Sequence, residues 1–460
     1  MSSDQRRVAV VGGGIAGLAA AHALVTQHDA EHRPSVVVFE RDSRFGGKLR
    51  TSPFAGHPAI DEGADAFLAR IPWATQLAQA VGLGDQLVSP DTRSAAVWWN
   101  ALHAIPEGLL LGMPTEILAL TRSSLLSWPG KFRAASEPFR RRTSLEPDSL
   151  GQFVRARFGH EVHHRLVDPL VGSIYAANTD HFSLAAVPQI ADIANRGRSV
   201  LITGRRMPKA ATVVGPVFQT PNEGMGALAA ATAAAVVASG GALRSQTSVD
   251  RLEPDGSGWR VNEEYFDGVI LAAPASAASR LLVTHAPQAA GILAAIPTAD
   301  VALVALSLDA ADWPANLAGM SGYLVPKPMQ RLVTAASFGS QKWAHWATPG
   351  TALLRISLGR DGLPVLHLSD DQLLAAAVGE VGEHLGIALQ PLSHRITRWP
   401  GAFPQYRPHH AVYIETAQRS LPAGIALAGA SYHGIGVPAC IRSGQQAAEA
   451  MYTFLNSVAQ

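Results

Sequence analysis

A glycine-rich stretch near the N-terminus constrains the fold more than any other part of this sequence. Residues 8–25 read VAVVGGGIAGLAAAHALV, eighteen positions without a charge, which is long enough to suggest a membrane-spanning helix. However, a β-branched run precedes glycines in GxGxxG spacing, helix-forming residues follow them, and a second apolar run, SVVVFE, ends at Glu40. Strand, tight turn, helix and strand in this order predict a dinucleotide-binding α/β unit instead.

The conspicuous residues of this motif each have a physical role in such a unit. Gly12 permits the tight turn out of the strand, Gly14 lets the backbone approach a pyrophosphate, and Gly17 lets the helix pack closely on the sheet. The helix N-terminus offers unpaired N–H groups to phosphate, and Glu40 is placed to accept hydrogen bonds from ribose hydroxyls. A glycine-rich turn that binds no ligand is the alternative.

The residues after Glu40 favour FAD over NAD. The chain continues as ERDSRFGGKLRTSPFAGHPAIDEGADAF, with Arg44 ahead of the pair Gly46-Gly47 and Lys48 behind it. An NAD-binding unit normally passes from the acidic residue into another helix and strand, whereas this segment stays loop-like and rich in glycine. Such a loop suits a longer cofactor, and we therefore expect FAD.

Composition narrows the class of protein further. A chain of 460 residues, 47% hydrophobic and 16% charged, suits a globular protein of two or more domains. Its net charge of +1 provides no field that would attract nucleic acid. Cys440 is the only cysteine, which excludes internal disulfides, and the histidines lack HExxH-type spacing, so no metal site is expected. The opening MSSDQRR lacks signal-peptide features, which predicts a cytoplasmic location.

Several blocks of the sequence resemble a known family. The pattern GGGIAGL…E…R-x-GGK…DEGADAF resembles the flavin monoamine-oxidase-like superfamily, which includes phytoene desaturases. Residues 148–184, DSLGQFVRARFGHEVHHRLVDPLVGSIYAANTDHFSL, are similar to the signature of the FAD-dependent coproporphyrinogen III oxidase and protoporphyrinogen oxidase family. GMPTEILAL, NEGMGALAAA, WPGAFPQY and LAGASYHGIGVPACIRSGQQAA occur in that family's order. The resemblance covers essentially the whole chain.

The resemblance and the strand pattern together imply an α/β fold in three parts. We expect a Rossmann-type FAD-binding domain split over residues 1–100, 215–285 and 398–460, a helical subdomain of residues 101–214, and a sheet-and-helix substrate-binding domain of residues 286–397. The uncharged run 224–243 should form a buried helix that ends in a turn, and an amphipathic helix capped by Ser369 or Asp370 is expected in the substrate-binding domain.

Candidate cofactor contacts come from the glycine motif, the loop behind it and the resemblance. They are Gly12, Gly13, Gly14, Ile15, Ala16 and Gly17; Glu40, Arg41, Arg44, Gly47 and Lys48; Gly63, Ala64, Asp65 and Ala66 along the flavin; Val249 at the adenine; and Trp399, Ile435, Gly436 and Val437 at the flavin. The family often has proline where this chain has Ala64. The helix expected after Val437 would direct its N-terminus at the flavin and stabilise negative charge there.

Three residues are candidates for substrate contact, all through the resemblance. Relatives place a basic residue near a substrate propionate at the position of Arg70, whose guanidinium suits a carboxylate; a surface salt bridge is the alternative. Ser173 stands where relatives usually carry glycine close to the substrate, and Tyr175 lies either against the tetrapyrrole or in the core. No catalytic acid or base is assigned, because aromatisation of the macrocycle supplies its own driving force.

The function implied by the resemblance is oxygen-dependent oxidation of a porphyrinogen to a porphyrin in haem biosynthesis, by hydride transfer to FAD with release of hydrogen peroxide. The arginine-rich middle segment favours coproporphyrinogen III, which carries more carboxylates than the alternative substrate, protoporphyrinogen IX. A flavin amine oxidase, a carotenoid desaturase and a flavin-binding partner without turnover stay open as further alternatives.

Partners other than the substrate are expected from the same resemblance. Other haem-pathway enzymes are candidates. The basic residues Arg140, Arg141 and Arg142 would face an anionic membrane surface, attract a substrate with several carboxylates or, as we favour, lie in a solvated loop between helices.

Overall fold

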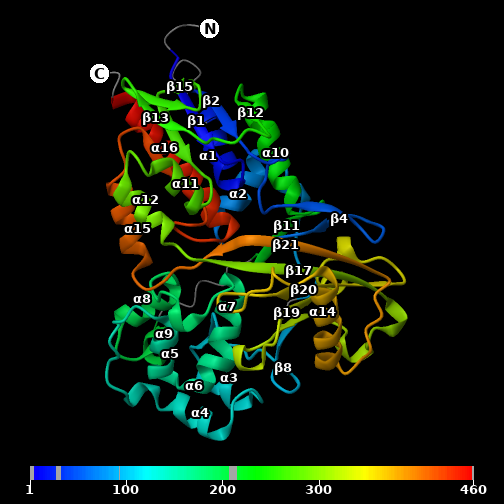
Figure 1. Ribbon diagram of the computed structural model, residues 1–460. Coiled ribbons are helices and arrows are strands. Elements are labelled where there is room, and N and C mark those ends of the chain that lie inside the picture. Colours follow the sequence, from blue (N-terminus) through cyan, green and yellow to red (C-terminus); the bar gives the residue numbers. More distant parts are fainter. Residues whose placement is uncertain (1–4, 27–32, 93, 207–214, 458–460) are drawn as a thin grey trace.

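A computed structural model describes residues 5–26, 33–92, 94–206 and 215–457 of the chain. Its upper part in Figure 1 contains a five-stranded sheet in the order β12-β2-β1-β16-β22. Every pair of neighbours in this sheet is parallel. The strands are β1 (Arg7–Val11), β2 (Ser35–Phe39), β12 (Ala242–Arg244), β16 (Gly268–Leu271) and β22 (Ile425–Leu427). Segments from distant parts of the chain therefore share one sheet.

Helices cover both faces of this parallel sheet, which explains why its strands are apolar throughout. Val8 and Val10 of β1 point into one apolar core, and Ala9 and Val11 point into another. The first core includes α1 (Ile15–Thr26), α2 (Pro72–Ala80), α10 (Met225–Ala238) and α16 (Val437–Ser457). The second includes α11 (Ala275–Leu282), α12 (Pro287–Ala294) and α15 (His410–Arg419). The first uncharged run thus forms β1 and α1 of a packed α/β core. The helix and the turn predicted for residues 224–243 are confirmed, but α10 is buried on one side only, with Val237 exposed.

A second, seven-stranded sheet crosses the middle of the molecule in the order β21-β17-β20-β19-β18-β7-β8 (Figure 1). Its strands are β21 (Ser393–Pro404), β17 (Thr298–Asp309), β20 (Thr351–Leu358), β19 (Val333–Phe338), β18 (Met320–Leu324), β7 (Ser94–Trp98) and β8 (Leu102–Ala104). Helix α14 (Asp370–Leu385) packs against it. As predicted, Ser369 caps this helix, and it forms a capping box with Gln372.

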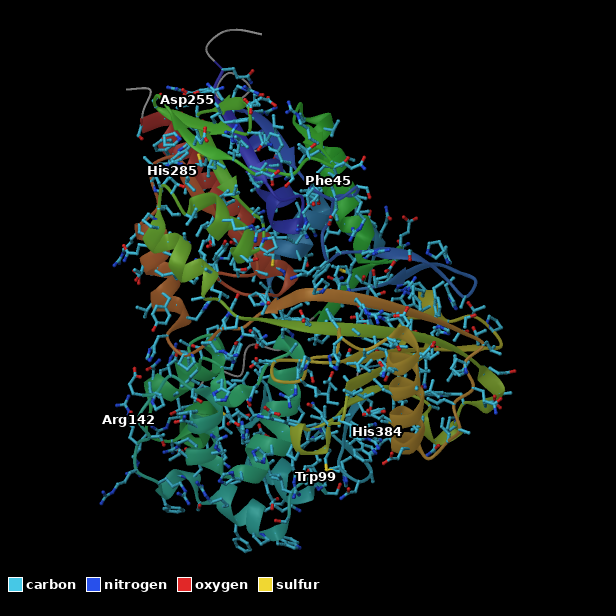
Figure 2. The ribbon with its side chains drawn as sticks, in the orientation of Figure 1. Phe45, Trp99, Arg142, Asp255, His285 and His384 are labelled. Atoms are coloured by element: carbon cyan, nitrogen blue, oxygen red, sulfur yellow. The ribbon has the colours of Figure 1, made fainter. Side chains whose placement is uncertain are left out.

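A helical region lies below the long strands β17 and β21 in Figure 1. Its helices are α3 (Ile117–Arg122), α4 (Trp128–Ala135), α5 (Leu150–Phe158), α6 (His160–Val162), α7 (Asp168–Tyr175), α8 (Pro188–Arg196) and α9 (Val200–Arg206). A buried ion pair between Arg157 and Glu137 holds its interior, and the Glu137 carboxylate also accepts from the Val200 backbone at the start of α9. Arg140, Arg141 and Arg142 are exposed, and Arg142 stands at the outer edge (Figure 2).

Shorter elements connect these three parts. They are the hairpin β3 (Thr51–Phe54) and β4 (His57–Asp61), the small sheet β5 (Phe67–Leu68), β11 (Phe218–Pro221) and β6 (Leu87–Val88), the pair β9 (Leu109–Leu110) and β10 (Met113–Pro114), the sheet β13 (Leu252–Asp255), β14 (Gly258–Val261) and β15 (Glu264–Phe266), and the helix α13 (Gly339–Lys342).

The strand pairing differs from the expected division of the chain at three places. Strand β8 lies in the segment 101–214, which we expected to be the helical subdomain, yet it pairs with β7 in the seven-stranded sheet. Strand β7 lies inside the segment 1–100, which we expected in the FAD-binding domain, yet it pairs with β18 of the seven-stranded sheet. Strand β21 includes Trp399, so residues 398–404 also belong to that sheet. Local sequence patterns identify a strand but not its distant partner, and these boundaries were placed from local patterns alone.

Candidate cofactor site

The turn between β1 and α1 is too tight for any residue other than glycine at two of its positions. Gly12 has φ +112°, and a Cβ there would lie 2.8 Å from the Ala272 backbone. A Cβ on Gly17 would lie 2.0 Å from the Gly12 carbonyl oxygen. A Cβ on Gly14, by contrast, would meet no atom within 4 Å. The turn therefore leaves open space at Gly14, directly before the free N–H groups of α1.

Glu40 lies beside this turn. Its Oε2 accepts a hydrogen bond from the Gly13 amide at 2.8 Å, and its Oε1 accepts one from the Asp42 amide at 2.9 Å. A carboxylate can accept further bonds, so capacity for ribose hydroxyls remains. The Thr247 amide donates to the Glu40 carbonyl at 2.8 Å, which brings the segment containing Val249 to the same place.

The loop after β2 is held by one of its own arginines. The Arg44 guanidinium donates to the carbonyls of Phe45 and Leu49, each at 3.2 Å, and to that of Gly47. Burial lowers the pKa of Arg44. Arg44 thus shapes the loop from within. Arg41 is exposed and lies 3.7 Å from Asp42, its partner in an ion pair.

Lys48 follows the glycine pair of the loop, and its side chain is partly exposed while its ammonium reaches inward. Its ammonium donates to the Ala402 carbonyl of β21, and burial lowers the pKa of this lysine. The Cys440 thiol of α16 is buried, which raises its pKa to about 11.

The segment 63–66 is anchored on the seven-stranded sheet. The Asp65 carboxylate lies 2.7 Å from the Lys342 ammonium and 3.2 Å from the Arg355 guanidinium. Burial alone would raise the pKa of Asp65, but these two cations outweigh burial and hold it well below its ordinary range. Arg355 also donates to the Gly63 carbonyl. Asp65 therefore forms ion pairs with a cation of α13 and a cation of β20, and its expected position along the flavin stays a prediction.

Trp399 closes the same area from β21. Its indole N–H donates to the Glu62 carbonyl at 2.7 Å. Trp399 and Phe403 pack against a cluster of small apolar residues from α7, β17 and β21, namely Ala176, Ala299, Val301 and Ala402. This cluster forms a small buried apolar core beside the candidate cofactor residues.

The last candidate cofactor segment connects β22 to α16. Gly429 and Gly434 in this loop have φ values of +122° and +125°, and α16 begins at Val437. A Cβ on Gly429 would lie 3.9 Å from the Ala16 side chain, so this loop lies next to the N-terminal turn of α1. Candidate residues from four separated segments thus surround one region.

The three candidate substrate residues have different surroundings. Arg70 is exposed, and no acidic side chain of the described residues forms an ion pair with it, so the salt-bridge alternative has no partner. Ser173 donates to the Pro169 carbonyl within α7 at 2.5 Å. The Tyr175 ring packs 4.7 Å from the Phe182 ring, and burial raises the pKa of its phenol. Tyr175 precedes Ala176 of the small apolar cluster, whereas Arg70 lies between β5 and α2.

Sequence reasoning missed a polar contact area between the helical region and the seven-stranded sheet. Lys327 donates to the Asn178 side chain at 2.5 Å and lies 3.5 Å from Asp180. Arg407 makes two hydrogen bonds to Asp361, at 2.7 and 2.9 Å. Asn178 and Asp180 belong to the block YAANTDH, which the resemblance already singles out. Their contact to Lys327 could not be predicted, because Lys327 lies far away in the sequence.

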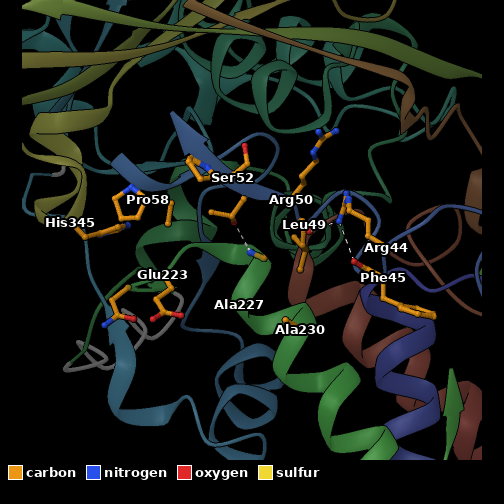
Figure 3. Close-up of a pocket in the computed structure, with 15 residues that line it drawn as sticks. Arg44, Phe45, Leu49, Arg50, Ser52, Pro58, Glu223, Ala227, Ala230 and His345 are labelled. Carbon is orange, nitrogen blue, oxygen red and sulfur yellow. Dashed lines mark hydrogen bonds between the residues drawn. The ribbon is translucent and has the colours of Figure 1, made fainter. Parts of the chain in front are cut away.

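A cavity of about 580 Å³ opens on the outer side of the loop, between the loop, the hairpin β3–β4 and α10 (Figure 3). It is lined by Arg44, Phe45, Leu49, Arg50, Thr51, Ser52, Pro53, Pro58, Ala59, Asn222, Glu223, Gly226, Ala227, Ala230 and His345. Of the candidate cofactor residues only Arg44 lines it, so this cavity is distinct from the space at Gly14.

The glycine-rich turn, the acidic residue at the end of β2 and the N-terminus of α1 lie together at one site. This arrangement is typical of α/β proteins that bind a nucleotide cofactor. A family model described as flavin containing amine oxidoreductase matches residues 15–452. The chain belongs to this family, and its cofactor is a flavin.

Named relatives are similar over their full length. Coproporphyrinogen III oxidase of Mycobacterium leprae is 34% identical over 97% of this chain and 98% of its own. Coproporphyrinogen III oxidase of Bacillus subtilis is 30% identical over 99% of this chain and 100% of its own. A crystal structure from Exiguobacterium sp. 255-15, assigned as a protoporphyrinogen oxidase, is 29% identical and covers 98% of this chain and 99% of its own, with a TM-score of 0.84. These similarities confirm the predicted resemblance.

The described residues contain no helix with both the length and the apolar character needed to cross a bilayer. Within the same residues, no group of three or more His, Cys, Asp or Glu side chains is arranged to hold a metal ion.

Proposed function

We propose that this protein oxidises coproporphyrinogen III to coproporphyrin III in haem biosynthesis, with FAD as its cofactor and molecular oxygen as the electron acceptor. The full-length similarity to the coproporphyrinogen III oxidases of M. leprae and B. subtilis, at 34% and 30% identity, carries this proposal. The Exiguobacterium structure assigned as a protoporphyrinogen oxidase makes protoporphyrinogen IX the second candidate substrate. The cytoplasm is the proposed location.

The candidate cofactor residues fit FAD. The open space at Gly14 has room for a diphosphate at the N-terminus of α1, and Glu40 keeps acceptor capacity for a ribose. The segment 245–249 lies where an adenosine would extend, and the loop before Val437 lies where a flavin ring would end. When bound, FAD supplies a two-electron acceptor for hydride.

Positioning and exclusion of water are the contributions of the protein itself in this proposal. The small buried apolar cluster at Ala176, Val301 and Ala402 would exclude water from the region next to Trp399, where we propose that the macrocycle binds. Arg70 supplies an exposed guanidinium, without an ion-pair partner among the residues that the structure describes, for a carboxylate at the edge of that macrocycle. Each round removes two electrons and two protons from the substrate, and their transfer to oxygen gives hydrogen peroxide.

The test is turnover of both porphyrinogens by purified, FAD-loaded protein. We expect porphyrin fluorescence to rise together with oxygen consumption and peroxide formation, and to rise faster with coproporphyrinogen III than with protoporphyrinogen IX. A faster reaction with protoporphyrinogen IX would assign the second candidate. Flavin-loaded protein that oxidises neither substrate but oxidises primary amines would contradict the proposal.

A further inference from the structure

Tyr406 lies where three parts of the structure meet. It follows β21 of the seven-stranded sheet, and its side chain is buried in the apolar core of the helical region. The Ser183 amide of that region donates to the Tyr406 carbonyl at 2.8 Å. Its ring lies parallel to the Phe182 ring at 6.1 Å and to the His410 ring at 4.1 Å between centroids. The position of this tyrosine is therefore fixed by its neighbours.

The hydroxyl of Tyr406 connects this fixed ring to the loop between β22 and α16. It donates to the Ala430 carbonyl at 2.5 Å and accepts from the Gly434 amide at 2.8 Å. One hydroxyl thus donates a hydrogen bond to a short backbone turn and accepts another from the same turn. Because Gly434 has φ +125°, the turn has no regular secondary structure. Its Ala430 carbonyl and Gly434 amide are therefore satisfied by the tyrosine hydroxyl.

Two further side chains hold the same loop from its outer side. The His410 Nε2 atom lies 3.1 Å from the Ser431 carbonyl oxygen. The Cys440 thiol lies 3.8 Å from the Gly434 carbonyl and 3.6 Å from that of Ile435. Ile435 packs against the core of the helical region, whereas Cys440 lies in the core under the parallel sheet. The loop therefore bridges two cores.

We propose that Tyr406, supported by His410, is a positioning residue that fixes the turn at 434–437 and the start of α16 against the flavin. This inference rests on the proposed function, because Ile435, Gly436 and Val437 face the flavin only if the cofactor binds as proposed. The N-terminus of α16 carries partial positive charge, so its placement affects a reduced, anionic flavin more than an oxidised one. Tyr406 acts through the loop and has no proposed contact with the substrate.

The test compares Tyr406→Phe with the wild-type protein. Phenylalanine keeps the packed ring and removes both hydrogen bonds to the loop. We expect FAD to dissociate from the variant at least tenfold more readily, with an altered visible spectrum of the bound flavin. We also expect the midpoint potential to fall; a tenfold greater loss of affinity for reduced than for oxidised flavin corresponds to about 30 mV for a two-electron couple.

Tyr323→Phe is the matched control. Tyr323 is about equally buried, and its hydroxyl on β18 lies 3.0 Å from the His384 Nδ1 atom on α14. This control should lose stability without a change in FAD affinity, spectrum or potential. If Tyr406→Phe does not accumulate as folded protein, His410→Ala provides the same comparison, with a smaller change in the same direction.

The outcomes separate this inference from the proposed function. A wild-type protein that binds FAD, together with a Tyr406→Phe protein of unchanged affinity, spectrum and potential, would contradict the inference alone. Equal changes in Tyr406→Phe and Tyr323→Phe would reduce Tyr406 to a structural residue and would also contradict it. A folded wild-type protein that takes up no FAD would contradict the proposed function.

Discussion

At the scale of single residues, two buried carboxylates four positions apart have opposite environments. Asp65 faces Lys342 and Arg355, which lower its pKa. Asp61 forms no ion pair within the described residues. Burial raises its pKa to about 6, although a hydrogen bond from Thr51 and the charge of Arg355 favour the charged form. Asp61 also accepts from the Met225 amide at the start of α10. An aspartate side chain thus serves as an ion-pair partner at position 65 and caps a helix at position 61.

Asp61→Asn should remove a pH dependence of stability. The folded-state pKa of Asp61 is raised, so its contribution to stability is complete below pH about 4 and is lost as the pH rises through about 6. Asparagine keeps an acceptor for the Met225 amide but does not titrate. We expect the difference in unfolding free energy, variant minus wild type, to increase by about 2–3 kcal/mol when the pH is raised from 4 to 7. Urea unfolding at both pH values measures this, and an unchanged difference would contradict it.

Gly14→Ala should separate cofactor binding from folding. An added Cβ meets no protein atom within 4 Å, so the melting temperature of the flavin-free protein should stay within about a degree of wild type. The same methyl group would occupy the space proposed for the diphosphate, and we expect FAD affinity to fall at least tenfold. Gly17→Ala is the contrast, since its Cβ would clash with the Gly12 carbonyl and lower the melting temperature itself. Undiminished FAD affinity in Gly14→Ala would place the diphosphate elsewhere.

Arg70→Ala tests recognition of carboxylates. The guanidinium is exposed and has no ion-pair partner among the described residues, so its removal should leave stability nearly unchanged. We expect the Michaelis constant to rise more for coproporphyrinogen III than for protoporphyrinogen IX, because the former carries more carboxylates. Steady-state kinetics with both substrates gives the comparison. Equal effects on both would remove Arg70 from substrate recognition.

Residue roles were predictable where they depend on local backbone, and not where they depend on distant partners. The tight turn at Gly12 and Gly17 follows from the spacing of the glycines in the sequence. The cations around Asp65 come from positions 342 and 355, which no local pattern connects with it. Tyr406 was similarly visible only as part of the block WPGAFPQY, because its hydrogen bonds reach a loop near the C-terminus.

At the scale of elements, the close contact between α1 and α16 depends on one glycine. A Cβ on Gly444 would lie 2.1 Å from the Ala16 carbonyl oxygen, and this backbone cannot move without displacing the first turn of α1. The small residues of α1, which follow the GxGxxG motif, therefore serve packing against a C-terminal helix as well as the turn itself.

Gly444→Ala should accordingly destabilise the protein, whereas Gly379→Ala should not. We expect the first substitution to cost about 1–3 kcal/mol through overpacking. Gly379 lies on the exposed side of α14 with no atom within 4 Å of an added Cβ, so alanine there should stabilise by about 0.5–1 kcal/mol. Chemical denaturation of both variants measures the difference. Equal effects of the two substitutions would contradict the packing argument.

Elements with strong local signals were predicted well. The strand–turn–helix–strand unit, α10 and the capped helix α14 form where apolar periodicity, glycines and Ser369 indicate. The membership of β7 and β21 in the seven-stranded sheet was not predicted. The local sequence pattern of a strand does not depend on which sheet the strand joins.

At the scale of the whole molecule, β21 joins the two sheets. It pairs with β17 along the seven-stranded sheet, while Lys48 and Glu62 of the N-terminal region bond to Ala402 and Trp399 on it. The two sheets are thus joined by contacts at the candidate cofactor site itself.

FAD should therefore stabilise the entire chain. A ligand bound only by the folded state, at about 100 times its dissociation constant, adds about 2.7 kcal/mol. We expect one cooperative thermal transition that moves to higher temperature as FAD is titrated, read by circular dichroism. A transition that does not move with FAD would contradict binding to the folded state, and riboflavin serves as the control because it lacks the diphosphate.

The division of the parallel sheet among remote segments also has a consequence for biogenesis. The edge strand β22 and the covering helix α16 lie more than 400 residues after β1 along the chain. The parallel sheet therefore cannot be completed until β22 and α16 have also been synthesised. Until then the apolar strands of β1 and β2 lack part of their cover, and the complete cofactor site is not yet formed.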